Sequence, residues 1–128
     1  MSYYFARTLP IGFDEAVGRI TDALRKEGFG VITEIDVRDI FKKKLNVDFR
    51  KYRILGACNP TMAHEALQIE DKVGTMLPCN VVVQDAGGGN TEIVAIDPVA
   101  SMLAIDNPRL KSAAESVRAK LRKVIDSL

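Results

Sequence analysis

Two short segments carry the residue types with the most chemical potential in this sequence. The chain's two cysteines both precede an asparagine, in ACNP (57–60) and in LPCN (77–80). A thiolate is a nucleophile and a soft metal ligand, and an amide side chain both donates and accepts hydrogen bonds. The two segments therefore indicate either one polar site assembled from two parts of the chain, or two turns of similar sequence.

A site at these segments would use Cys58, Asn59, Cys79 and Asn80. A helix that begins after Asn59 would place its positive end beside Cys58 and favour the thiolate, and the two amides would complete a small polar pocket. The structural alternative is that buried cysteines pack in the core while Asn59 caps the helix. We carry both interpretations forward, with no catalytic residue assigned.

His64, the single histidine, completes the set of candidate ligand-binding residues. Helical spacing places it opposite the apolar stripe of its own helix, so we expect it on a surface. As a base for Cys58 it would need a third group to orient it, and the sequence offers none. Two cysteines and one histidine also fall short of the four ligands of a structural zinc site, so we expect no metal and no cofactor within one chain.

Two charged groups have simpler explanations. Glu34, Asp36 and Asp39 could hold a cation, but Asp36 is better placed as a helix N-cap with the other two solvated. The strongest basic cluster is Lys42–Lys44 with Arg50, Lys51 and Arg53. Helical spacing spreads the three lysines around a helix, which favours a solvated face over an anion site, although an anionic small molecule stays an alternative. The run Gly87–Asn90 lacks the Lys-Ser/Thr ending of a phosphate loop and is typical of a hairpin turn.

Composition limits the classes of partner. The 128 residues fit one α+β domain (1–128), with 47% hydrophobic and 27% charged residues. With a formal net charge of +1, the chain has no overall electrostatic field that would attract nucleic acid or anionic membranes. No apolar run is long enough to cross a bilayer. The first ten residues do not resemble a secretion signal, so we expect a cytoplasmic protein with free cysteines.

Hydrophobic periodicity predicts the order β-α-β-(α)-β-(α)-β-β-α. The expected strands are 2–9, 29–37, 52–58, 79–85 and 91–97. The expected helices are 13–27, 38–45, 60–73 with Asn59 as its N-cap, one turn at 98–103, and 108–127 with Asn107 as its N-cap. Alternation in the strands favours a mostly antiparallel sheet with helices on one face, and the two cysteines then fall at one end of it.

Two packing expectations follow from the same patterns. In the second strand, Phe29, Val31, Thr33, Ile35 and Val37 should share one face, opposite Glu34 and Asp36. The apolar stripe of the last helix, Leu110 to Leu128, should pack on the sheet rather than on a partner chain.

The segments GFGVITEIDV (28–37), YRILGACNP (52–60), AHEAL (63–67) and LPCNVVV (77–83), in this order, resemble the bacterial and archaeal family known as domain of unknown function 302. The resemblance implies a curved antiparallel sheet of the TATA-binding-protein-like class, with β-α-β(4)-α order, and a homodimer. It implies no activity or substrate, and a fold shared with a DNA-binding protein does not imply DNA binding.

The sequence thus favours a homodimeric module that binds a small molecule or a partner in a pocket near the two Cys-Asn motifs. The absence of a complete catalytic set argues against an enzyme. The alternative is a thiol-dependent enzyme or redox sensor that uses Cys58 or Cys79. A third hypothesis is metal or haem binding with ligands shared across a dimer.

Overall fold

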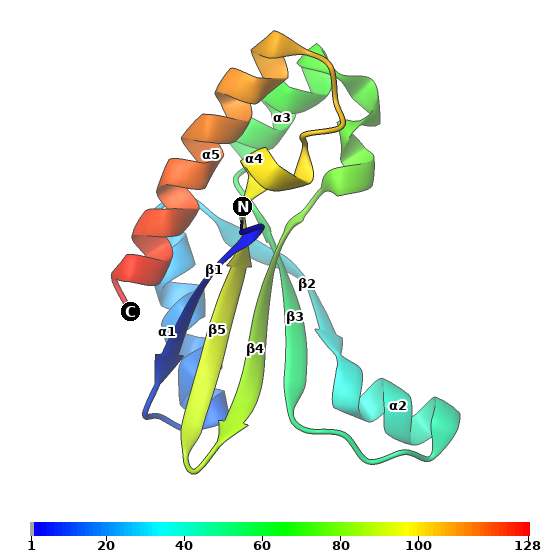
Figure 1. Cartoon of the computed structure of the whole chain (residues 1–128), viewed down its shortest axis with the longest axis vertical. Helices are drawn as coiled ribbons and strands as arrows, with labels where there is room; N and C mark the ends of the chain where they lie inside the picture. Colours follow the sequence, from blue (N-terminus) through cyan, green and yellow to red (C-terminus); the bar gives the residue numbers. More distant parts are fainter. Residues whose placement is uncertain (1) are drawn as a thin grey trace.

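The computed structural model describes residues 2–128 and contains one antiparallel sheet with the strand order β1-β5-β4-β3-β2 (Figure 1). The strands are β1 (Tyr4–Leu9), β2 (Gly30–Asp36), β3 (Tyr52–Cys58), β4 (Cys79–Gly87) and β5 (Asn90–Ile96). The helices are α1 (Phe13–Lys26), α2 (Val37–Leu45), α3 (Pro60–Ile69), the 3₁₀ helix η1 (Asp71–Met76), α4 (Pro98–Ser101) and α5 (Pro108–Asp126). The predicted α+β class and element order are confirmed.

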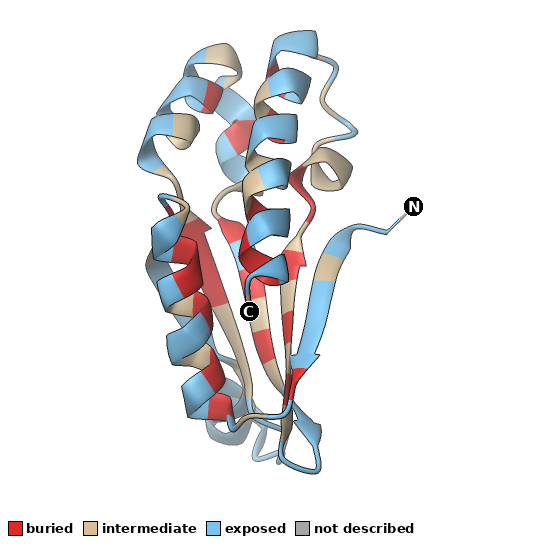
Figure 2. Ribbon diagram, turned by 90° about the vertical axis from the view of Figure 1, so that its left-hand side faces the viewer, coloured by how far each residue is buried: buried red, intermediate tan, exposed pale blue. Residues whose placement is uncertain are grey.

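The sheet buries one of its faces. Alternate residues of the central strands are almost fully buried on this face, whereas the residues between them stay partly exposed, as the red and tan bands along these strands in Figure 2 show. The residues of the central strands that are buried on this face are Leu55, Ala57, Cys79, Val81, Val83, Thr91, Ile93 and Ala95. In Figure 1, α1 lies behind the strands, so the view looks onto the opposite, uncovered face.

α1 covers the buried face through the stripe expected from the sequence, of which Ala16, Ile20 and Leu24 are 0% exposed. Acidic residues lie in its first turn and basic residues in its last, which suits the helix dipole. Gly28 follows with φ +84°, a left-handed conformation that glycine adopts without strain. The chain can therefore reverse directly into β2.

α5 packs on the sheet through its C-terminal half, as expected, and on other helices of the chain through its N-terminal half. Leu121 and Val124, in its C-terminal half, belong to the main core with the sheet and α1. Leu110, near its N-terminus, instead packs with Ala66 and Val73 in a second cluster. This division arises because α5 extends past the end of the sheet, where α3 and α4 pack against it (Figure 1).

α3 is shorter than expected. The apolar spacing predicted one helix to Val73, but α3 ends at Ile69 and η1 carries Val73 into the second cluster. Glu70 between them is extended, with φ −146° and ψ 105°, and this breaks the helix. Burial of Val73 is therefore achieved by a different local structure from the one that the periodicity indicated.

β2 does not keep its apolar residues on one face. A register shift between Val31 and Thr33 makes Val31 face Ala57 on the buried side, while Ile35 faces Ile54 on the uncovered side. A bulge adds one residue to a strand and so reverses the side-chain alternation beyond it. The sequence pattern has no means of signalling this insertion.

α2 and the loop after it project beyond the end of the sheet (Figure 1). Asp36 caps this helix as expected, since its Oδ1 accepts a hydrogen bond from the Asp39 N–H at 3.0 Å. No residue of α2 is buried, and its apolar residues Ile40 and Leu45 are 37% and 65% exposed. Among residues 2–128, none of the helices combines the length and hydropathy needed to cross a bilayer.

Candidate functional site

The antiparallel pairing of β3 and β4 brings the two cysteines to the same end of the sheet, as the strand alternation predicted. Cys58 is the last residue of β3 and Cys79 is the first residue of β4, and Ala57 lies directly across from Cys79. Cys79 is buried and Cys58 is partly exposed, and both are free thiols. The Leu77–Pro78 peptide bond that leads into β4 is cis.

A cavity of about 230 Å³ adjoins this end of the sheet. Cys58, Asn59 and Cys79 line it from the strands and the start of α3. Its other walls come mainly from the apolar sides of two helices: Met62, Ala63 and Ala66 of α3, and Leu110, Ala113, Ala114 and Val117 of α5. Apart from the two thiols, Asn59 is the single lining residue with a polar side chain, so the cavity is strongly apolar.

Asn59 shapes the entrance of the cavity. Its Oδ1 accepts the N–H of Met62 at 3.2 Å, which caps α3 as the sequence predicted, with Pro60 at the first helical position. The Asn59 Nδ2 lies close to the backbone of Gly28: a Cβ added to Gly28 would be 3.0 Å from this nitrogen. Ile32, 62% exposed, also lines the cavity, which places the opening between β2 and the start of α3.

The electrostatics of the site keep the deeper thiol neutral. Burial raises the pKa of Cys79 to about 11, and the nearby Cys58, as a like charge, adds to the effect. A neutral thiol behaves as a small hydrophobic group with a weak donor. Within residues 2–128, no three His, Cys, Asp or Glu side chains cluster closely enough to hold a metal ion.

The other two candidate residues lie away from the cavity. His64 is exposed on α3, as predicted, and is not part of the lining. Asn80 is the second residue of β4 and lies across from Gly56, which carries its side chain to the uncovered face of the sheet. The structure therefore brings together Cys58, Asn59 and Cys79, and separates His64 and Asn80 from them.

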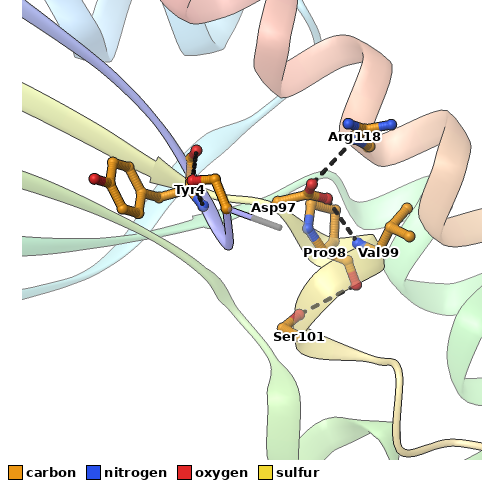
Figure 3. Close-up of polar contacts among 7 residues, drawn as sticks. Tyr4, Asp97, Pro98, Val99, Ser101 and Arg118 are labelled. Carbon is orange, nitrogen blue, oxygen red and sulfur yellow. Dashed lines mark hydrogen bonds and ion pairs between the residues drawn. The ribbon is translucent and has the colours of Figure 1, made fainter.

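An ion pair with a buried carboxylate beside the cavity was missed by the sequence reasoning. Asp97 is 1% exposed; its Oδ1 accepts the N–H of Val99 at 3.0 Å, and its Oδ2 accepts the Nε hydrogen of Arg118 at 3.1 Å (Figure 3). Pro98, the next residue, lines the cavity. The sequence Asp97-Pro98 repeats the cap-and-proline pattern of Asn59-Pro60, and that repetition is the signal that could have revealed it.

The architecture is thus an α+β protein with a one-sided antiparallel sheet and an apolar cavity at one end of it. Residues 5–128 match the family model described as Domain of unknown function DUF302, and the chain belongs to this family. It is also similar to a crystal structure described as an uncharacterized conserved protein DUF302 from Bacillus stearothermophilus. The two share 29% sequence identity over 98% of each chain, with a TM-score of 0.90. No curated protein matches the sequence.

Proposed function

We propose that this protein binds a small apolar molecule in the cavity between the Cys58/Cys79 end of the sheet and helices α3 and α5. The observation that supports this function is a cavity of about 230 Å³ whose walls are almost entirely apolar. Binding sites of proteins are typically concave and mostly apolar, with a few polar groups that orient the ligand. Asn59 at the entrance and the two thiols are the polar groups available here.

The volume limits the size of the ligand. An apolar cavity of about 150 Å³ stays dry and accepts benzene. The present cavity is half again as large, so it suits two fused aromatic rings or a chain of about eight carbons. A charged group inside it would meet no charged partner, so the part of the ligand that enters the cavity is uncharged.

Binding of naphthalene tests the proposal, with 2-naphthoate as its charged counterpart of the same ring size. Saturation-transfer NMR on the purified protein should detect naphthalene in a competable site and find much weaker transfer to 2-naphthoate. Ala63→Trp fills the entrance from α3 and should abolish naphthalene binding. Leu67→Trp, one turn along the same helix and outside the lining, is the matched control and should bind as the wild type does.

Two results would contradict this function. The first is the absence of any saturable naphthalene signal from the folded wild-type protein. The second is equal binding by the Ala63→Trp and Leu67→Trp variants, since the site would then lie elsewhere.

A thiol-dependent reaction is the second candidate, because both cysteines line the same cavity. The raised pKa of Cys79 opposes a role for it as a nucleophile, since the reactive species is the thiolate. Cys58, partly exposed at the strand end, is the residue that such chemistry would use. Rapid alkylation of Cys58 by iodoacetamide at pH 7, at a rate above that of the unfolded chain, would favour this candidate over simple binding.

A further inference from the structure

The cavity at the end of the sheet is lined by a large share of the chain's sulfur-bearing residues. Four of its 17 lining residues carry sulfur, whereas only six of the 128 residues in the chain do. The four are Cys58, Met62, Cys79 and Met102, so both thiols and two of the four methionines line one cavity. The cavity is therefore rich in soft ligand atoms as well as apolar.

We propose that Cys58 and Cys79 bind a copper(I) ion at the sheet end of this cavity, with the thioether of Met62 as a third ligand. Thiolate and thioether sulfur are the ligands that select Cu(I). One Cu⁺ replaces the protons of the two thiols, so the products are a complex with a single negative charge and two protons released to solvent. The metal site shares the cavity of the proposed function but does not rest on the binding of an apolar molecule.

The backbone brings the three proposed ligands to one end of the sheet. Cys58 is the last residue of β3, and its neighbour Ala57 lies directly across from Cys79 in β4. Asn59 follows Cys58, and its Oδ1 accepts the N–H of Met62 at 3.2 Å, which fixes the first turn of α3 beside the strand end. Segments that are 21 residues apart in the sequence, at Cys58 and Cys79, thus contribute to one wall of the cavity.

The set of lining residues favours a soft monovalent ion over zinc or a hard cation. The lining contains no carboxylate and no imidazole, and His64 is exposed elsewhere on α3. Zinc takes four ligands, and residues 2–128 contain no cluster of even three His, Cys, Asp or Glu side chains. Cu(I) needs only about two or three sulfur ligands, which the cavity contains.

The electrostatics suit a complex with one negative charge. α3 begins at Pro60, so the positive end of its dipole lies beside Cys58. Burial raises the pKa of Cys79 to about 11, so without a metal this thiol stays protonated at neutral pH. A coordinating thiol gives up its proton to the metal, so the raised pKa lowers the affinity without preventing binding.

Packing alone explains one of the four sulfur-bearing residues. Methionine fills irregular apolar walls, and Met102 packs with the cluster that contains Val73 and Leu110. We therefore give Met102 no part in the metal site. Cys58 differs, because it is partly exposed beside the opening at Ile32, where an ion can enter from solvent.

A competition titration tests the site. Cu(I), supplied as its acetonitrile complex in the absence of oxygen, is added to the reduced, metal-free protein together with the chromogenic chelator bathocuproine disulfonate. We expect one Cu(I) per chain, which an equal concentration of Zn²⁺ does not displace. Cys58→Ser and Cys79→Ala should each weaken Cu(I) binding at least about 100-fold, and Met62→Leu about tenfold. Met76→Leu, outside the lining, is the matched control and should bind as the wild type does.

Circular dichroism shows whether each variant is folded. If Cys79→Ala does not fold, Cys58→Ser at the partly exposed position and Met62→Leu decide the outcome. The proposal is overturned if the wild type loses all its copper to the chelator. It is also overturned if Cys79→Ala binds as tightly as the wild type, because Cys58 alone then holds the ion, or if Met62→Leu and Met76→Leu have equal effects.

Naphthalene binding is measured separately, on the metal-free protein. A chain that binds Cu(I) but not naphthalene contradicts only the proposed function, and a chain that binds naphthalene but not Cu(I) contradicts only the metal site.

Discussion

Arg118 and Asp97 form a hydrogen-bonded ion pair, with 3.1 Å between Nε and Oδ2, that fastens α5 to the end of β5. The two residues differ in their exposure: the Asp97 side chain is 2% exposed and that of Arg118 is 42% exposed. Asp97 therefore depends on its partners within the chain, whereas the guanidinium can be hydrated. The same carboxylate caps α4, so one side chain holds together three elements around the cavity.

Replacement of Asp97 should destabilise the protein strongly. Asp97→Ala removes the cap of α4 and its ion pair with the half-exposed Arg118, and we expect the free energy of unfolding to fall by about 1–3 kcal/mol. Asp97→Asn keeps an oxygen for the N–H of Val99 and should lose about half as much. Urea unfolding followed by circular dichroism measures both values, and equal losses for Ala and Asn would show that the cap contributes nothing.

Gly56 should tolerate no side chain. A Cβ at this position would collide with the Thr33 hydroxyl and lie 2.6 Å from Cγ of Pro78. Because strand β3 is held between β2 and β4, neither neighbour can retreat freely, and Gly56→Ala should lower the free energy of unfolding by about 2–3 kcal/mol. Gly30→Ala on β2 is the control, since nothing lies within 4 Å of its added Cβ; a loss there as large as at Gly56 would contradict the steric explanation.

The stability of the protein should fall in alkaline solution through Cys79. The pKa of this thiol is 9.0 in its reference state and about 11 in the folded protein, because burial opposes its ionisation. Between these pH values the unfolded chain releases the proton while the folded chain keeps it. The unfolded state then binds fewer protons, so the free energy of unfolding decreases as pH rises, by about 2–3 kcal/mol across the window.

Comparison of the wild type with Cys79→Ala isolates this effect from the titration of lysines and tyrosines. The two proteins should show free energies of unfolding that converge between pH 9 and pH 11, because the variant has no thiol to ionise. Cys58→Ala serves as the control for removal of a thiol in general. Curves for wild type and Cys79→Ala that stay parallel over this range would show that Cys79 titrates normally.

Local signals in the sequence predicted most of the fold. Alternation, caps and glycines predicted the elements, because each depends on neighbouring residues only: Asn59 caps α3 and Gly28 ends α1. The bulge at Val31 and the break at Glu70 were not predicted, since neither leaves a signal in the hydrophobic periodicity of its segment. The TATA-binding-protein-like class that the resemblance implied stays a prediction.

The candidate site was predicted in part, and for a topological reason. Antiparallel pairing places the end of one strand beside the start of the next. This topology correctly predicted that Cys58 and Cys79 lie at the same end of the sheet. Asn80 was grouped with them by its similarity to Asn59, but successive residues of a strand point to opposite faces. The walls of the cavity come from α3 and from α5, and α5 lies about thirty residues beyond Cys79 in the chain. No local sequence pattern around Leu110 or Ala114 distinguishes residues that line a cavity from residues in a filled core.

The cavity itself should be detectable from the stability of a variant that fills it. Ala66 is 7% exposed and lines the cavity, whereas Ala16, on the buried side of α1, is 0% exposed in the packed core. Ala66→Leu adds apolar atoms to open space and should raise the free energy of unfolding by about 1–2 kcal/mol. Folding removes the added carbon atoms from water, and no neighbouring side chain has to move to make room for them. Ala16→Leu adds the same atoms where no space exists and should lower it by about 1–3 kcal/mol. Thermal and urea unfolding of the two variants provide the comparison, and naphthalene binding by Ala66→Leu should weaken as its stability rises. Destabilisation by both substitutions would mean that the space beside Ala66 is filled in solution.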